Sequence, residues 1–291
     1  MTREIREVLT GFHYLEAPRF HDGRLWVSDF YLHQVVSAEP DGSDVRVEAE
    51  VPAQPSGLGW LPDGRLLVVS MRDQRVLRRE PDGTLVTHAD LSGALPGHVN
   101  DMVVDERGRA YVGSFGFDLM NGGALAPSKL ARVDPDGTVT VVAEELWFPN
   151  GSVLDGATLI VNETFGNRMT AFDVAEDGSL TNRRVWASFG LVPTETEIGR
   201  VLPQLVVAPD GACLDAEGAV WIADGTGGRA LRVRQGGAIV DEVQAGSGVF
   251  AVGMAGHTLY LCAAPDFDEH ARSNAREARL LAVEVDVPAA G

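Results

Sequence analysis

The chain has 291 residues, of which 45% are hydrophobic and 7% aromatic. This is enough apolar material for a large core and excludes general disorder. The formal net charge of −18 argues against a nucleic-acid partner or an anionic membrane partner, because both require a basic surface. The first seven residues lack the apolar core of a signal peptide, and no apolar run approaches membrane-spanning length. We therefore expect a cytoplasmic protein.

One sequence pattern recurs along the chain, and it is clearest at residues 209–224. A short strand at 212–214, a turn at 215–218 and an apolar strand at 219–223 predict a β-hairpin there. Five further copies occur along the chain, four before this one and one after it, at intervals of roughly 40 to 60 residues, within or slightly beyond the spacing of propeller blades. When the copies are aligned on their turn glycine, one position is occupied by Glu16, Ser56, Asn100, Asn150, Asp210 and Gly248.

The segments between these copies contain further strand pairs, which flank Asp-Gly turns such as those at 41–42 and 82–83. A hairpin needs positive φ at such turns, and glycine adopts it readily. We therefore predict an all-β fold: a six-bladed β-propeller with four antiparallel strands per blade, forming a single domain over residues 1–291. Residues 4–10 and 280–287 also have strand patterns. Their pairing in one blade would close the ring and protect both edges.

Two connections, at about 115–127 and 188–204, are longer than simple turns. Long ordered loops in a compact domain are usually functional or mobile. These two could form a lid over one mouth of the ring, or they could be solvated insertions. The two cysteines, Cys213 and Cys262, lie in strand patterns of different repeats, and we expect both to be reduced core residues.

The shared position in the repeats has a chemical meaning in a propeller. The first strand of each blade lines the central channel, so Glu16, Asn100, Asn150 and Asp210 should converge there. Two carboxylates and two amide oxygens suit a hard cation, which makes Ca²⁺ the expected ligand, with Zn²⁺ or Mn²⁺ as alternatives. Asn150 and Asp210, each before a Gly, would alone be ordinary turn formers, and Glu16 alone would be a solvated carboxylate. The common register of all four favours the metal.

Four ordered motifs resemble those of the gluconolactonase/regucalcin (senescence marker protein) family: Leu15-Glu16-Ala-Pro-Arg-Phe20, His98-Val-Asn100-Asp101, Trp147-Phe-Pro-Asn150-Gly151 and Ala208-Pro-Asp210-Gly211. The resemblance implies a six-bladed propeller that holds one divalent cation, usually Ca²⁺ or Zn²⁺. It also implies hydrolysis of lactones or, in a related branch, of organophosphate esters. By motif position, Glu16, Asn150 and Asp210 match the family's metal ligands. Asn100 matches a position that binds metal or substrate.

The function expected from these residues is metal-dependent hydrolysis of a lactone or related ester, a small-molecule substrate. The cation would polarise the carbonyl and activate a water molecule, and Asp210 or Asp101 would act as the general base. Two alternatives stay open, because a fold does not dictate function. One is a non-catalytic propeller that binds calcium or another ligand. The other is the same scaffold used for phosphotriester hydrolysis or for a biosynthetic reaction.

One position departs from the family pattern. Sugar-lactone hydrolases tend to carry an Arg two residues before the Asn of the Asn-Asp pair, where it meets substrate hydroxyls, and this chain has His98 there. His98 is therefore a candidate substrate contact, although it could also be an ordinary loop residue. The other candidates for substrate binding, besides Asn100, are apolar: Phe115, Phe117, Trp147, Phe148 and Phe250. We expect a substrate that is less polar than an aldonolactone.

Overall fold

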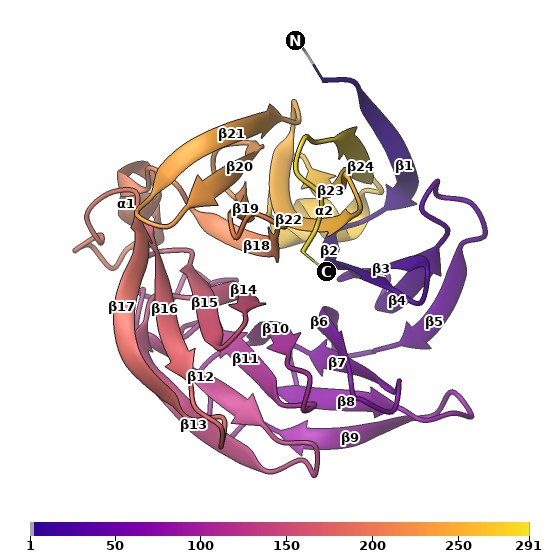
Figure 1. The fold of residues 1–291 in the computed structure, drawn as a ribbon, viewed down its shortest axis with the longest axis horizontal. Coiled ribbons are helices and arrows are strands. Elements are labelled where there is room, and N and C mark those ends of the chain that lie inside the picture. Colours follow the sequence, from indigo (N-terminus) through magenta and orange to yellow (C-terminus); the bar gives the residue numbers. More distant parts are fainter. Residues whose placement is uncertain (1–2, 291) are drawn as a thin grey trace.

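The computed structural model describes residues 3–290 and forms a ring of six four-stranded antiparallel sheets (Figure 1), so the predicted six-bladed propeller is confirmed. The first blade contains β2 (Leu15–His21), β3 (Arg24–Asp29), β4 (Gln34–Ala38) and β5 (Arg46–Glu50). The second contains β6 (Pro55–Trp60), β7 (Leu66–Ser70), β8 (Arg75–Arg79) and β9 (Leu85–Asp90). The third contains β10 (Val99–Val104), β11 (Ala110–Ser114), β12 (Ser128–Val133) and β13 (Val139–Leu146).

The remaining three blades follow the same order from the axis outward. The fourth contains β14 (Pro149–Asp155), β15 (Thr158–Glu163), β16 (Arg168–Val174) and β17 (Leu180–Ser188). The fifth contains β18 (Pro209–Leu214), β19 (Val220–Asp224), β20 (Arg229–Arg234) and β21 (Ala238–Gln244). The sixth contains β22 (Gly248–Ala255), β23 (Thr258–Ala264), β24 (Ala278–Glu284) and β1 (Ile5–Phe12).

The sixth blade closes the ring as predicted. Its strand order is β22-β23-β24-β1, and β1 pairs antiparallel with β24 from Ile5 opposite Val283 to Phe12 opposite Ala278. Leu9 and Phe12 of β1 are buried against the rest of the blade. The outermost strand of this blade is therefore supplied by a segment far from the other three in sequence, which protects the edge of β24.

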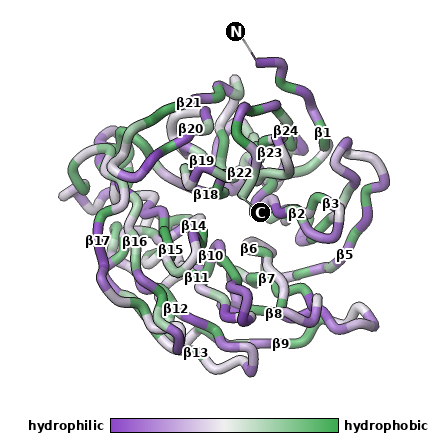
Figure 2. The backbone as a smooth tube through the Cα atoms, in the orientation of Figure 1, coloured by the Kyte–Doolittle hydropathy of each residue, from purple (hydrophilic) through white to green (hydrophobic). Residues whose placement is uncertain are grey.

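Burial decreases from the middle of each blade toward the rim. Every residue of β7, β11 and β19 is buried, because neighbouring blades cover both faces of these second strands. The outer strands have one solvent-facing side, and Figure 2 shows this hydrophilic character along β17. The core is thus made of apolar side chains packed between adjacent sheets, in line with the continuous apolar runs of the second strands.

The innermost strands all contain an irregularity near the same end. The pairing register shifts between Pro209 and Ala212 in β18, and corresponding shifts occur in the inner strands of the other five blades. Such bulges re-aim side chains and are common next to active sites. The strand predicted at 212–214 is longer in the structure, so Asp210 lies inside β18, at the bulge. In the sixth blade the residue at the irregularity is Phe250, so Phe250 replaces Gly248 as the sixth member of the shared position.

The glycine after Asn150 has a packing role and does not form a turn. Asn150 and Gly151 lie within β14, and a Cβ added to Gly151 would be 2.5 Å from the carbonyl oxygen of Asp210 in the next blade. Only glycine lets the two inner strands approach so closely. The turn-forming explanation for Asn150-Gly151 is therefore wrong.

The helical segments are short and lie in the long connections. The 188–204 loop contains α1 (Ile198–Val201) and a 3₁₀ turn (Leu202–Gln204), which the sequence did not predict. Its Thr196 carbonyl accepts a hydrogen bond of 2.7 Å from the Leu125 amide in the 115–127 loop, so the two loops are tied together. A third connection carries α2 (Glu269–Asn274). None of the helices within residues 3–290 has the length and apolar character needed to cross a membrane.

Candidate metal and substrate site

The four oxygen-bearing residues that share the repeat position come together in the structure. Glu16, Asn100, Asn150 and Asp210 are all buried, and all line one pocket at the centre of the ring. They come from β2, β10, β14 and β18, the inner strands of four different blades. The bulge in each inner strand sets the direction of these side chains. Convergence of residues separated by nearly 200 positions is thus a direct result of the propeller geometry.

A chain of side-chain hydrogen bonds crosses the site from blade to blade. The Ser56 hydroxyl donates to Oδ1 of Asn100 over 3.0 Å, and Nδ2 of Asn100 donates to Oδ1 of Asn150 over 2.8 Å. Nδ2 of Asn150 in turn donates to the Thr164 hydroxyl over 3.1 Å, and this hydroxyl donates to the Pro209 carbonyl over 2.9 Å. An amide oxygen has two lone pairs, so each Asn keeps an acceptor site for a further ligand. The network fixes both amides in place.

The two carboxylates of the site lack a basic partner. Within residues 3–290, neither Glu16 nor Asp210 forms an ion pair with Lys, Arg or His. Burial raises the pKa of Glu16 well above its usual range, and the charges of Asp210 and Asp101 add to the rise. Burial also raises the pKa of Asp210 well above its usual range, and the charge of Asp101 raises it further. Two buried and uncompensated carboxylates are costly without a cation.

A hard divalent cation fits this donor set. The described part of the chain has no cluster of three or more His, Cys, Asp or Glu placed to hold a metal ion. The set found here has only two carboxylates and completes its oxygen donors with Asn100 and Asn150. All four donors are oxygens, which Ca²⁺ prefers, and none is the nitrogen or sulfur ligand that favours softer ions.

Asp101 lies next to Asn100 but has different partners. Its Oδ1 accepts a 2.9 Å hydrogen bond from Nη2 of Arg19 and a 2.8 Å bond from the Met102 amide. Arg19 also donates to the Met102 carbonyl over 3.0 Å, so the pair is anchored to β10. Asp101 is absent from the residues that line the central pocket. Its negative charge nevertheless raises the pKa of both Glu16 and Asp210.

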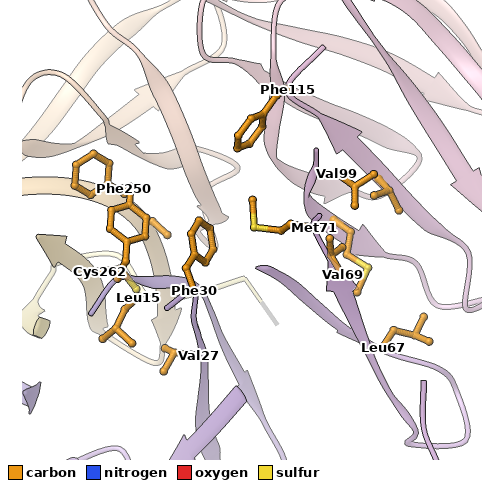
Figure 3. Packing of buried hydrophobic residues seen from close by; sticks show 14 of the residues in the cluster. Leu15, Val27, Phe30, Leu67, Val69, Met71, Val99, Phe115, Phe250 and Cys262 are labelled. Atoms are coloured by element: carbon orange, nitrogen blue, oxygen red, sulfur yellow. The ribbon is translucent and has the colours of Figure 1, made fainter. Parts of the chain in front are cut away.

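The walls of the pocket are largely aromatic. Of the six predicted substrate contacts beside Asn100, the structure places Phe115, Phe148 and Phe250 on the pocket wall, whereas His98, Phe117 and Trp147 do not line it. Figure 3 shows Phe30, Phe115 and Phe250 around the space at the centre of the ring. The His98 ring lies behind Phe115, with their centroids 5.8 Å apart. The other lining residues, which the sequence did not predict, include Tyr14, Phe30, Tyr31, Leu119, Met120, Thr164, Phe165, Leu202 and Phe267.

Loops from three connections contribute to the mouth of the pocket. Leu119 and Met120 come from the 115–127 loop, Leu202 from the 188–204 loop, and Phe267 from the connection that carries α2. The two predicted lid loops thus reach the same pocket as the oxygen donors. The α2 connection is held in place by Arg272, whose guanidinium bonds Asp266 over 3.0 Å and Glu277 over 2.8 Å.

Three buried carboxylates brace the backbone just before three of the donors. Asp29, Glu163 and Asp224 each lie at the end of a second strand, in the blades of Glu16, Asn150 and Asp210. They accept hydrogen bonds from the amides of His13 (2.8 Å), Trp147 (2.8 Å) and Ala208 (3.0 Å), respectively. The sequence does show this pattern, because each of these apolar second strands ends in an acidic residue. That signal has meaning only once the facing strand is known.

Replacement of one brace should weaken the fold measurably. Glu163 is fully buried and accepts bonds from Arg168 at 2.8 and 2.9 Å as well as from Trp147. Glu163→Gln leaves Arg168 without its counter-charge, and we expect a loss of about 3 kcal/mol in the free energy of unfolding. Urea denaturation measures this loss. The exposed pair of Glu144 and Lys129 is the matched control, and Glu144→Gln should change stability by less than about 1 kcal/mol. Equal effects of the two variants would contradict the bracing role.

Comparison with known proteins gives the family of this propeller. The fold and the central oxygen-donor pocket define a six-bladed propeller with a candidate cation site. The chain belongs to the family described as SMP-30/Gluconolactonase/LRE-like region, whose model matches residues 15–264. The resemblance stated from the sequence motifs is thereby confirmed.

Individual relatives are more distant. The chain is 30% identical over 156 residues to a 6-deoxy-6-sulfogluconolactonase of Pseudomonas putida, covering 53% of this chain and 48% of the relative. It is 29% identical over 137 residues to regucalcin of Danio rerio, covering 46% of this chain and 41% of the relative. The matched segments thus span about half the length of these relatives. Among solved structures, the calcium-binding protein regucalcin from Agrobacterium tumefaciens superimposes with a TM-score of 0.79 at 21% identity, covering 99% and 96% of the two chains.

Proposed function

We propose that this protein is a divalent-metal-dependent hydrolase of a lactone or related ester, with Ca²⁺ as the expected cation and Zn²⁺ or Mn²⁺ as alternatives. The observation that carries the proposal is the pair of buried, uncompensated carboxylates, Glu16 and Asp210, in one pocket with Asn100 and Asn150. The family membership supports it, because the Pseudomonas putida relative is a lactonase by name. The name of the Agrobacterium structure supports calcium.

In such a reaction, some residues of the site would hold the cation and one would act as the general base. Glu16, Asn100, Asn150 and Asp210 would hold the cation, which when bound polarises a carbonyl and lowers the pKa of a nearby water molecule. Asp210 would accept the proton of the attacking water, because its buried carboxylate lines the pocket in which that water would lie and a carboxylate within reach of a water can take its proton. Asp101 is the weaker candidate for the base, since Arg19 and the Met102 amide already occupy its Oδ1.

The pocket favours a substrate less polar than a sugar lactone. Around the oxygen donors the lining is aromatic and aliphatic, and it contains no Lys, Arg or His. The hydroxyls of an aldonolactone would lose hydrogen bonds to water without gaining enough partners, which is unfavourable. An alkyl or aryl substituent would instead bury apolar surface against Phe115, Phe148 and Phe250.

A panel of lactones with one ring size tests both the activity and this preference. We expect calcium-loaded protein to hydrolyse δ-decalactone with a kcat/KM about 10²-fold higher than that for glucono-δ-lactone, because the pentyl chain is buried on binding. A chelator should abolish turnover, and added Ca²⁺ should restore it. A preference for glucono-δ-lactone would contradict the apolar-substrate proposal. Calcium binding without turnover of any lactone, ester or organophosphate would instead favour the non-catalytic binding propeller.

A further inference from the structure

Tyr14 occupies a position in the pocket that the proposed mechanism has not used. It precedes β2, two residues before Glu16, and lines the same pocket as Glu16 and Asp210. The residue is 7% exposed, and its ring packs against Phe30 and Phe250, with ring centroids 5.1 Å away in both cases. The side chain is therefore held between two aromatic walls beside the oxygen donors.

The backbone around Tyr14 is fixed by Asp29, one of the bracing carboxylates. Asp29 accepts hydrogen bonds from the amides of His13 (2.8 Å) and Tyr31 (3.0 Å). The Tyr14 carbonyl in turn accepts a 3.0 Å bond from the Phe30 amide. A side chain whose ring and backbone are both constrained meets a substrate with little loss of conformational freedom.

The hydroxyl of Tyr14 is a hydrogen-bond donor without a protein partner. Tyrosine hydroxyls buried elsewhere in this protein are bonded: Tyr111 donates to the Gly178 carbonyl over 3.1 Å and Tyr260 to the Pro40 carbonyl over 3.2 Å. For Tyr14, no hydrogen bond of the hydroxyl to any of residues 3–290 is found, and its oxygen is not one of the fully buried polar atoms that lack a partner in this part of the chain. Its open side is the pocket.

The other hydroxyls in the pocket are less suited to meet a substrate near the oxygen donors. Thr164 already donates to the Pro209 carbonyl over 2.9 Å, and Thr226 to Oδ1 of Asp224 over 3.4 Å. Burial raises the pKa of Tyr31, the charge of Glu269 in α2 raises it further, and Arg72 lowers it. Tyr31 therefore lies toward the α2 end of the pocket. Tyr14 is thus the hydroxyl beside the donors that stays available for a ligand.

We infer that Tyr14 is a catalytic residue that donates a hydrogen bond from its hydroxyl to the carbonyl oxygen of the bound lactone or ester. The inference rests on the proposed function. Negative charge develops on that oxygen as water attacks, and a fixed donor stabilises the developing charge more than the neutral carbonyl. A phenol carries its proton near neutral pH and can serve as this donor.

The test compares Tyr14→Phe with Tyr260→Phe in the calcium-loaded protein. Both variants keep the aromatic ring, but the Tyr260 hydroxyl donates to the Pro40 carbonyl and Tyr260 does not line the pocket. We expect Tyr14→Phe to lower kcat on δ-decalactone about 10²-fold with little change in KM. We also expect it to weaken binding of the corresponding δ-lactam, measured by calorimetry, about three- to tenfold. Tyr260→Phe should leave both quantities within about twofold, as expected for loss of a hydroxyl that makes no hydrogen bond to the substrate.

Three outcomes would overturn the inference. The first is a Tyr14→Phe variant with unchanged kcat and unchanged lactam affinity. The second is loss of the calcium-induced rise in melting temperature in this variant, which would assign Tyr14 to the cation site. The third is absence of lactam binding by the unmodified protein. If that protein binds the lactam but hydrolyses no lactone, the proposed function fails, and the lactam affinity of Tyr14→Phe still decides the role of its hydroxyl.

Discussion

Asp210→Ala should abolish lactone hydrolysis together with the response to calcium. Asp210 is proposed both to hold the cation and to accept the proton of water, and loss of a general base alone lowers turnover about 10³-fold. In the unmodified protein, Ca²⁺ at 100 times its dissociation constant should raise the melting temperature by about 5 °C. The alanine variant should show no such rise. Differential scanning calorimetry with and without Ca²⁺, alongside lactone turnover, measures both effects.

A second variant, Asp210→Asn, gives a further test through the melting temperature of its metal-free form. The carboxylate of Asp210 is disfavoured by burial and by the charge of Asp101, so removing it relieves an unfavourable interaction. We therefore expect metal-free Asp210→Asn, which keeps the volume of the side chain, to melt no lower than the metal-free parent. Full turnover in Asp210→Asn combined with lost turnover in Asp101→Asn would show that Asp101 is the base.

Deletion of residues 1–12 should destabilise the whole ring. The deletion removes β1, exposes the edge of β24 and leaves the partners of Leu9 and Phe12 uncovered. Loss of two buried side chains of this size costs at least about 5 kcal/mol, which corresponds to a drop of about 10 °C in melting temperature. Thermal unfolding followed by circular dichroism measures the drop.

A shorter deletion is the control for ring closure. Removal of residues 1–4 eliminates Arg3, whose guanidinium pairs with Asp241 at 2.6 Å, but leaves β1 intact. Both side chains are partly exposed, so the loss should stay below about 1 kcal/mol. If the two deletions lowered the melting temperature equally, pairing of β1 with β24 would not be what stabilises the ring.

The propeller could be predicted because its signals are local and repeated. Asp-Gly turns and apolar second strands such as 219–223 recur at a regular spacing, and the spacing fixes the number of blades. The first strand of the repeat at 209–224 starts earlier than the predicted residue 212, and the repeat around Asn150 has the same kind of start. There the strands begin at Pro149 and Pro209, a residue tolerated at the first position of a strand. The bulges that follow depend on contacts between blades, which no local pattern reveals.

Only the site residues at the position shared by the repeats could be predicted from the sequence. Glu16, Asn100, Asn150 and Asp210 could be placed in one pocket from their common register, and the structure brings them together there. Tyr14 and Phe267 could not be placed, because the packing of non-repeated segments determines their positions. His98 shows that a motif position alone can mislead: it suggested a substrate contact, whereas the His98 ring packs near Phe115 and does not line the pocket.

The pairing of β1 with β24 also determines when the ring can close during synthesis of the chain. β1 ends at Phe12, and its partner β24 begins only at Ala278, so nearly the whole chain must be translated before the two strands can meet. Until then the sixth sheet lacks its outer strand, and an unpaired edge is a site for aggregation. Such distant pairing slows folding. Ring closure therefore comes late in synthesis or after it, and growth conditions that supply chaperones should raise the yield of native protein.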